Sequence, residues 1–288
     1  MIKRLKRFLA NVASVIKLPE ISILPGQLAF FFVLSVVPII ILISYGASFF
    51  NLSTDFIKNF VIRAFSSDLA NLIVPTVSGV KVGFSFFISL AVGFFIASNG
   101  ADSIIVTSNT IYNIKDSTYI RRRIKALIMT MLIVILFLFI LVFPVFGRKI
   151  TDLIAFVNLN ETVTNNIAAI TNLLSGPISW LVMFFFIKII YTMAPDRKVS
   201  SSTVTYGSLF TSICWILMTL VYSYYINHYA HYDVFYGGLA NIVVLMLWVY
   251  FLAYIFVIGM ALNYQEEEFT KTQELKAITS EDLKVKGE

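Results

Sequence analysis

The chain has 288 residues, of which 58% are hydrophobic and only 13% charged, and its mean hydropathy is +0.85. A water-soluble fold could not bury that much apolar surface, so the composition excludes a soluble globular protein. The net charge of +6 does not indicate nucleic-acid binding, because the basic residues lie at the ends of apolar segments. The single cysteine, Cys214, excludes an internal disulfide and a cysteine-based metal cluster. These features predict an all-α, polytopic membrane protein.

Residues 1–20 predict an amphipathic helix that lies in the membrane interface. Apolar residues recur at spacings of three and four, and most basic residues fall elsewhere on the helix. The apolar positions are Ile2, Leu5, Leu9, Val12 and Ile16. The basic side would be attracted to anionic headgroups. The apolar run that follows is too long for the hydrophobic region of a cleaved signal peptide, so we expect it to remain as the first span.

Six apolar segments follow, each long enough to cross a hydrocarbon core of about 30 Å. Their approximate limits are 24–50, 83–109, 125–147, 173–193, 203–227 and 236–262. They predict a six-helix transmembrane domain over residues 21–264. Residues 265–288 alternate acidic and basic side chains and predict a charged tail, either a frayed helix or a disordered segment.

The distribution of Lys and Arg predicts the orientation of these spans. Sixteen of the 22 basic residues fall on one side, in the N-terminal arm, the second and fourth gaps and the tail. Five fall on the other side, and one lies within a span. The positive-inside rule therefore predicts that both termini lie in the cytoplasm.

The second span contains a polar stretch that a membrane-spanning helix does not need. An ionisable residue within a span costs roughly 2.5–3.5 kcal/mol and usually faces a bundle interior or a wet cavity. Ser98, Asp102 and Asn109 are four and seven residues apart, so they share a helix face. One interpretation is a substrate or ion pathway, with Asp102 as its charged member and Asn99 and Asn109 as hydrogen-bonding partners. In the other, Asp102 pairs with Lys188 or an arginine and only fixes helix packing.

A single lysine and a cluster of basic residues near the membrane surface also have two interpretations each. Lys188, near the end of the fourth span, could extend to the headgroups or take part in the pathway. Arg121, Arg122 and Arg123, with Lys125, form the densest basic cluster. As a determinant of topology this cluster needs no ligand. Alternatively the arginines contact lipid headgroups, because a guanidinium group matches the geometry of phosphate.

The sequence contains no recognisable catalytic set. His228, His231 and Asp233 could suggest a metal site, but they lie among tyrosines that are typical of an interfacial aromatic belt. The chain has only two histidines, which excludes a metallo-nuclease built on several histidine ligands. It also lacks a glycine-rich phosphate loop. We therefore expect no metal, no cofactor and no enzymatic activity.

Several segments together resemble a known family. In the sixth span they are 236–240, 245–250 and 259–263, and in the first span they are Ala29, Phe30, Leu34, Ser35 and Pro38. After the second span they are Asn109, Ile111, Tyr112 and Arg121–Arg123. Around the start of the fifth span they are Tyr191, Pro195, Arg197, Lys198, Val199, Gly207 and Trp215. The chain resembles the YihY/BrkB family over about residues 5–265. This resemblance implies a six-helix bacterial inner-membrane protein, for which ribonuclease, virulence and transporter labels have been used.

Three functions are consistent with these features. The first is a transporter, exporter or lipid translocator, for which the partners would be anionic membrane lipids and an unidentified small solute, ion or lipid substrate. The second is a membrane scaffold that transports nothing. The third, a ribonuclease, rests only on the family label. The chain could act alone or as a homo-oligomer.

Overall fold

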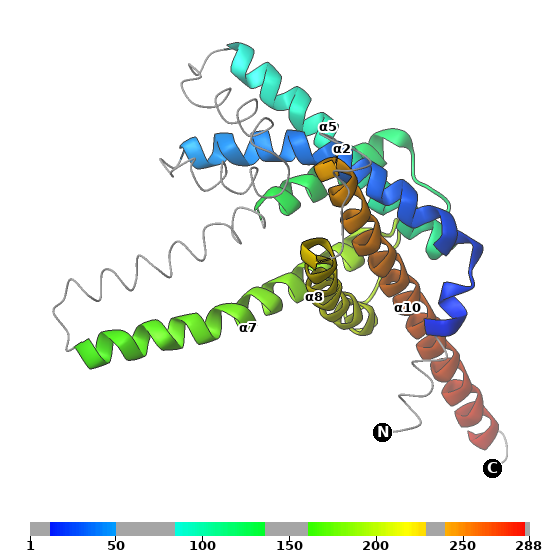
Figure 1. Ribbon diagram of the computed structural model, residues 1–288. Helices are drawn as coiled ribbons and strands as arrows, with labels where there is room; N and C mark the ends of the chain where they lie inside the picture. Colours follow the sequence, from blue (N-terminus) through cyan, green and yellow to red (C-terminus); the bar gives the residue numbers. More distant parts are fainter. Residues whose placement is uncertain (1–11, 50–83, 136–160, 229–239, 286–288) are drawn as a thin grey trace.

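The computed structural model describes residues 12–49, 84–135, 161–228 and 240–285 (Figure 1). Within these ranges the chain is entirely helical, with no strand. The long helices are α2 (Pro19–Phe49), α5 (Phe84–Ile111), α7 (Glu161–Met193), α8 (Thr205–His228) and α10 (Ala240–Val285). A further helix runs over 119–135, and 12–16 form a short helix before α2. The all-α prediction is therefore confirmed for the described ranges.

Four described helices are long and apolar enough to cross a membrane. The segments are Ala91–Ile111, Gly176–Met193, Thr205–Tyr225 and Val243–Gln273, and a shorter apolar helix covers Pro19–Ser35. The six-span count stays a prediction, because part of the predicted third span, 136–147, lies outside the described residues. The same holds for residues 1–11 of the predicted interfacial helix.

Helix α2 begins five residues before the apolar segment from which the first span was predicted. Pro19 is its first residue, a position that suits proline because the first N–H groups of a helix have no partner within the helix. Hydropathy locates the apolar residues of a helix but not its start signal, which explains the difference. The helix also continues through Pro25 and Pro38.

Helix α10 is much longer than the sixth predicted span. It has 46 residues and continues without interruption to Val285, so the predicted charged tail is helical over 265–285. The tail contains no glycine or proline before Val285, and many of its residues are good helix formers. An ion pair between Lys271 and Glu267, at 2.9 Å and four residues apart, adds to this helix.

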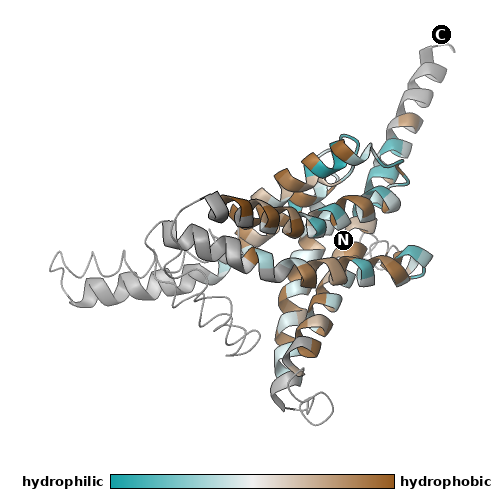
Figure 2. Ribbon diagram, turned by 90° about the horizontal axis from the view of Figure 1, so that it is seen from above, coloured by the Kyte–Doolittle hydropathy of each residue, from teal (hydrophilic) through white to brown (hydrophobic). Residues whose placement is uncertain are grey.

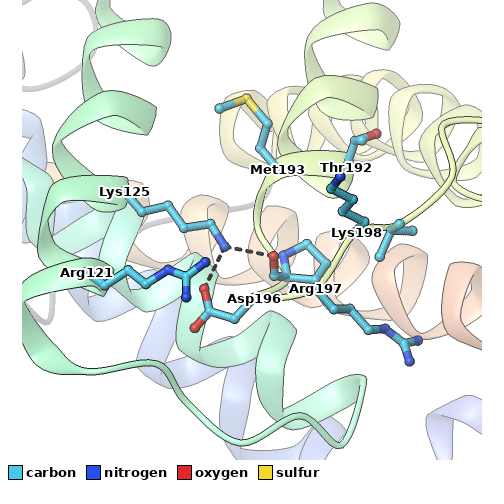
Figure 3. Close-up of a pocket in the computed structure, with 9 residues that line it drawn as sticks. Arg121, Lys125, Thr192, Met193, Asp196, Arg197 and Lys198 are labelled. Carbon is cyan, nitrogen blue, oxygen red and sulfur yellow. Dashed lines mark hydrogen bonds and ion pairs between the residues drawn. The ribbon is translucent and has the colours of Figure 1, made fainter.

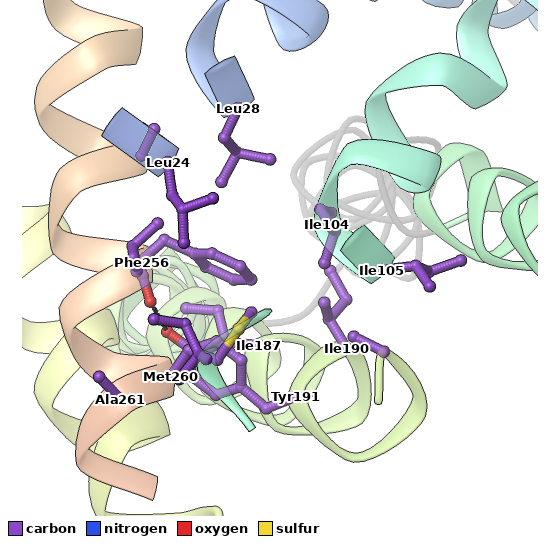
Figure 4. Close-up of a cluster of buried hydrophobic side chains, with 14 of the residues drawn as sticks. Leu24, Leu28, Ile104, Ile105, Ile187, Ile190, Tyr191, Phe256, Met260 and Ala261 are labelled. Carbon is purple, nitrogen blue, oxygen red and sulfur yellow. Dashed lines mark hydrogen bonds between the residues drawn. The ribbon is translucent and has the colours of Figure 1, made fainter. Parts of the chain in front are cut away.

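The buried core joins four of the long helices. Leu24 and Leu28 of α2, Ile104 and Ile105 of α5, Ile187, Ile190 and Tyr191 of α7, and Phe256, Met260 and Ala261 of α10 form one cluster (Figure 4). Many large apolar side chains are also exposed on the outside of the described helices. Figure 2 shows the hydrophobic stretches of these helices in brown. Such an apolar exterior is expected of helices that face lipid.

Four segments that are distant in sequence meet at one end of the bundle, which we call the basic end. They are residues 12–18, 112–118, 194–204 and 264–271. Gln265 Nε2 donates to Ser14 Oγ at 3.1 Å, the rings of Tyr112 and Tyr264 lie 5.4 Å apart, and Arg197 pairs with Glu267 at 2.9 Å. The charge count assigns these four segments to one side of the membrane. That this side is the cytoplasm stays a prediction.

Candidate functional site

The end of α5 forms a tight turn that folds the following loop back onto the helix. Asn113 has a φ of 52°, and the N–H of Ile114 donates to the carbonyl of Asn109 at 2.8 Å. This is the hydrogen bond of a Schellman-type helix end, in which asparagine can replace the usual glycine in the left-handed position. The turn brings Asp116 within reach of the Asn109 side chain.

Asn109 connects the two loops of the basic end. Its Nδ2 donates to Asp116 Oδ1 at 2.8 Å and to Asp196 Oδ2 at 2.9 Å. Its Oδ1 accepts from the backbone N–H of Asp196, also at 2.9 Å. The side chain is fully buried, and both of its amide hydrogens have partners. Asn109 therefore ties the segment after α5 to the segment after α7.

Lys125 completes this connection from the helix at 119–135. Its Nζ donates to Asp196 Oδ1 at 2.8 Å and to the carbonyls of Ala194 and Pro195 at 2.7 and 2.8 Å. Partial burial by itself would raise the pKa of Asp196, but the hydrogen bonds from Lys125, the Ser117 N–H and Asn109 outweigh it. The pKa of Asp196 therefore lies well below its usual range, and this carboxylate stays ionised.

Asp102 pairs with an arginine, as the packing interpretation expects. Arg122 Nε lies 2.9 Å from Asp102 Oδ1, and its Nη1 lies 3.4 Å from Asp116 Oδ2. Lys188 has no ion pair within the described ranges, and its carbonyl accepts from Thr192. Asp102 and Lys188 are therefore not brought together. Whether Asp102 also takes part in transport stays a prediction.

Arg123 is also directed toward α5. Its Nη1 donates to Asn99 Oδ1 at 2.8 Å, its Nη2 donates to the carbonyl of Phe95 at 2.6 Å, and its guanidinium lies 3.7 Å from the centroid of the Phe95 ring. Arg123 is buried, Arg122 is half-buried and Arg121 is exposed. Headgroup contact stays a prediction for all three arginines, and Arg121 is the exposed one among them.

The hydroxyl groups of α5 fall into two classes. Ser98 Oγ donates to the carbonyl of Phe95 at 2.7 Å, and Thr110 Oγ1 donates to that of Val106 at 2.9 Å, which is the usual arrangement inside a helix. Three other hydroxyls are buried and have no hydrogen-bond partner among the described residues. They belong to Ser103, Thr107 and Ser108, which we call the α5 hydroxyl group.

A pocket of about 450 Å³ opens beside the Lys125–Asp196 ion pair (Figure 3). It is lined by Arg121, Lys125, Thr192, Met193, Pro195, Asp196, Arg197, Lys198 and Val199. Four of these side chains are cationic and one is a carboxylate, so the lining favours an anion. Sequence reasoning missed Asp116 and Asp196 as members of the site. The available signal was an acidic residue within each of two otherwise basic gaps.

The family model for virulence factor BrkB matches residues 13–282, nearly the whole chain. The chain belongs to the virulence factor BrkB family. Among its relatives, the ribonuclease-like protein YfkH of Bacillus subtilis is 29% identical over 262 residues, which cover 89% of this chain and 94% of that protein. A UPF0761 membrane protein of Pseudoalteromonas translucida is 24% identical over 276 residues, 92% of this chain and 88% of the relative. No solved structure matches.

Membership in the BrkB family confirms the resemblance, and the four candidate spans agree with relatives that are named membrane proteins. BrkB is not a known enzyme family, although the B. subtilis relative carries a ribonuclease-like name. Among the residues that the structure describes, no group of three or more His, Cys, Asp or Glu could hold a metal ion. His231 and Asp233 of the histidine motif lie outside these residues, as does the side chain of His228.

Proposed function

We propose that this BrkB-family protein moves a solute, ion or lipid across the bacterial plasma membrane along α5. The α5 hydroxyl group carries this proposal. A buried hydroxyl without a partner costs about 1–3 kcal/mol, so an apolar side chain would be the cheaper choice for packing alone. Such groups in a native protein call for another explanation, such as contact with water or a passing solute.

The hydroxyls lie next to the network at the basic end. Thr107 and Ser108 immediately precede Asn109, and Asp102 lies within the same stretch of α5. In this proposal the Asp102–Arg122 pair and the Asn109 bridge close one end of the route and open by exchanging their contacts for water or substrate. Ser98, Asn99 and Lys188 belong to the pathway as first predicted, and they have less support because Ser98 and Asn99 already have partners.

Transport can be tested with purified protein in liposomes. Wild-type protein should accelerate either the scrambling of fluorescent phosphatidylglycerol and phosphatidylethanolamine or the efflux of entrapped anions. Thr107→Val keeps the side-chain shape, removes the unpartnered hydroxyl and should slow that flux about tenfold, equivalent to roughly 1.4 kcal/mol. Thr110→Val is the matched control, because Thr110 is exposed and bonded to its own helix. Absence of flux for every probe would exclude the proposal.

The cytoplasmic assignment of the basic end belongs to the same proposal. It rests on the excess of Lys and Arg in the N-terminal arm, the second and fourth gaps and the tail, to which the four segments that meet there belong. A green fluorescent protein fused after Glu288 should fluoresce, whereas alkaline phosphatase fused there should be inactive. The opposite pattern would invert the topology.

A membrane scaffold remains the second candidate, because α10 favours it. At 1.5 Å per residue a helix of 46 residues is about 69 Å long, roughly twice the thickness of a hydrocarbon core. Figure 1 shows its C-terminal part beyond the other helices, where it could dock a partner. Crosslinking in cells should then capture a stable partner that is lost when residues 272–288 are deleted, and no such partner should appear if α10 only packs.

A further inference from the structure

The pocket at the basic end contains two cations that have no ion pair among the residues that the structure describes. Lys125 is committed to Asp196 at 2.8 Å, and Arg197 to Glu267 at 2.9 Å. Arg121 and Lys198 are exposed and form no ion pair in the part of the chain that the structure describes. In Figure 3 they line the pocket from the helix at 119–135 and from the segment that follows α7. Both remain available for an external anion.

The pocket lies at the depth of lipid headgroups. Thr192 and Met193 line it, and Met193 is the last residue of the apolar segment Gly176–Met193. A span that ends at the pocket places the pocket at the boundary between hydrocarbon and water.

Exposed apolar side chains continue from the pocket along both of its helices. Ile124 and Ile128 are 55% and 54% exposed and follow Arg121 by three and seven residues, so they share its side of the helix. On α7, Ile189 and Phe185 are 42% and 49% exposed and precede Thr192 by three and seven residues. The cationic pocket thus adjoins one end of each of two exposed apolar surfaces.

This arrangement fits an anionic amphiphile better than a free anion. A guanidinium group can bind phosphate through two hydrogen bonds, and an ammonium group adds a point charge. A free phosphate would use only the pocket, whereas a phospholipid would also cover the exposed isoleucines and Phe185 with its acyl chains. We propose that an anionic phospholipid binds with its phosphate between Arg121 and Lys198 and its chains along these two apolar surfaces. Binding does not require transport, and only the idea that this lipid is the cargo rests on the proposed function.

The proposal differs from a simple role in topology. Basic residues that only orient the protein would remain hydrated and would not distinguish between lipids. A specific binding site should distinguish between lipids by their headgroup charge and by the length of their acyl chains. It should also depend on these two cations more than on others at the same end.

Native mass spectrometry of the detergent-solubilised full chain can test the site, with dioleoyl phosphatidylglycerol as the probe and dioleoyl phosphatidylcholine as the neutral comparison. Arg121→Gln with Lys198→Gln should weaken phosphatidylglycerol binding at least about tenfold. Lys17→Gln with Lys115→Gln is the matched control, because both residues are exposed at the basic end and the charge change is the same. It should retain wild-type binding. Equal unfolding temperatures of the variants would show that both fold.

Three other results of the binding experiment would overturn the proposal. Equal loss in the control variant would indicate a diffuse charge effect, and unchanged binding in the test variant would exclude these two residues. Inorganic phosphate or six-carbon phosphatidylglycerol that binds as well as the dioleoyl lipid would indicate a free-anion site without an acyl contribution. Flux is measured separately in liposomes. Selective binding without flux would exclude transport but support the lipid site. Flux without selective binding would support transport but exclude the lipid site.

Discussion

Lys125 Nζ lies 2.8 Å from Asp196 Oδ1, although the two residues are 71 positions apart in the sequence. The same ammonium group donates to the carbonyls of Ala194 and Pro195, so one side chain holds the C-terminal end of α7 against the helix at 119–135. Three donors matched to three acceptors satisfy all of the hydrogen-bonding capacity of lysine. Together with Asn109, Lys125 therefore joins the segments that follow α5 and α7 to the helix at 119–135.

Replacing Lys125 with methionine should therefore destabilise the protein. It leaves the Asp196 carboxylate and two carbonyls without their main donor, for a cost of about 1–3 kcal/mol where water can partly replace it. The unfolding temperature in detergent should fall, and Asp196→Asn should cost less in the Lys125→Met background than in wild type. Lys115→Met is the control, because Lys115 is exposed and unpaired within the described ranges. Additive effects of the two substitutions would contradict the direct pair.

Acidification should remove the contribution of Asp196. A free aspartate titrates at a pKa of about 3.9, whereas the pKa of Asp196 in the folded protein is well below its usual range. The unfolded chain therefore binds this proton first as the pH falls, and the stabilisation is complete above about pH 5 and decreases below about pH 4. The difference in unfolding temperature between wild type and Asp196→Asn should shrink over that range. A difference that stays constant down to pH 3 would contradict the low pKa.

The all-helical class and the main apolar segments could be predicted from the sequence, because the mean hydropathy of about twenty consecutive residues depends on those residues alone. The predicted ends of two helices were less accurate. Helix α2 begins at Pro19, before its apolar part, and α10 continues beyond its apolar part through charged residues that favour a helix. The family resemblance was confirmed over nearly the whole chain.

The candidate site could be predicted only in part. The polarity of α5 was visible in the sequence, and pairing of Asp102 with an arginine was one of the two stated alternatives. The bridge from Asn109 to Asp196 was missed, because it joins residues 87 positions apart through a turn and a loop. No periodicity or spacing encodes a contact of that kind. Counting charges also treated Lys125 as a topology signal and gave no indication of its partners.

Arg123→Lys should not be a conservative substitution. Arginine stacks on Phe95 while two different nitrogens donate to Asn99 and to the Phe95 carbonyl, and an ammonium group cannot reproduce that planar arrangement. We expect a loss of about 1–3 kcal/mol, seen as a lower unfolding temperature in detergent. Arg121→Lys, at an exposed position, should leave that temperature unchanged. Equal tolerance of both substitutions would show that the stack contributes nothing to stability.

Gly259→Ala should reduce the amount of folded protein, because α8 and α10 approach closely at this glycine. A Cβ atom there would overlap the hydroxyl oxygens of Thr211 and Tyr191, which bond to each other at 2.7 Å. Relief would require these buried side chains or the helices to shift, and separation of α8 from α10 would also break the hydrogen bond from the Gly207 N–H to Asn263 Oδ1. Small residues permit such contacts in membrane proteins, and overpacking costs about 1–3 kcal/mol or more.

Gly93→Ala is the matched control for this substitution, because a Cβ atom at Gly93 would meet nothing within 4 Å. Alanine favours a helix over glycine by about 1 kcal/mol, so this variant should be neutral or slightly stabilised. Fluorescence-detected size-exclusion chromatography of both variants, expressed from the same promoter, gives the comparison. A normal peak for Gly259→Ala would mean that a Cβ atom can be accommodated there without loss of folded protein, and would contradict the prediction.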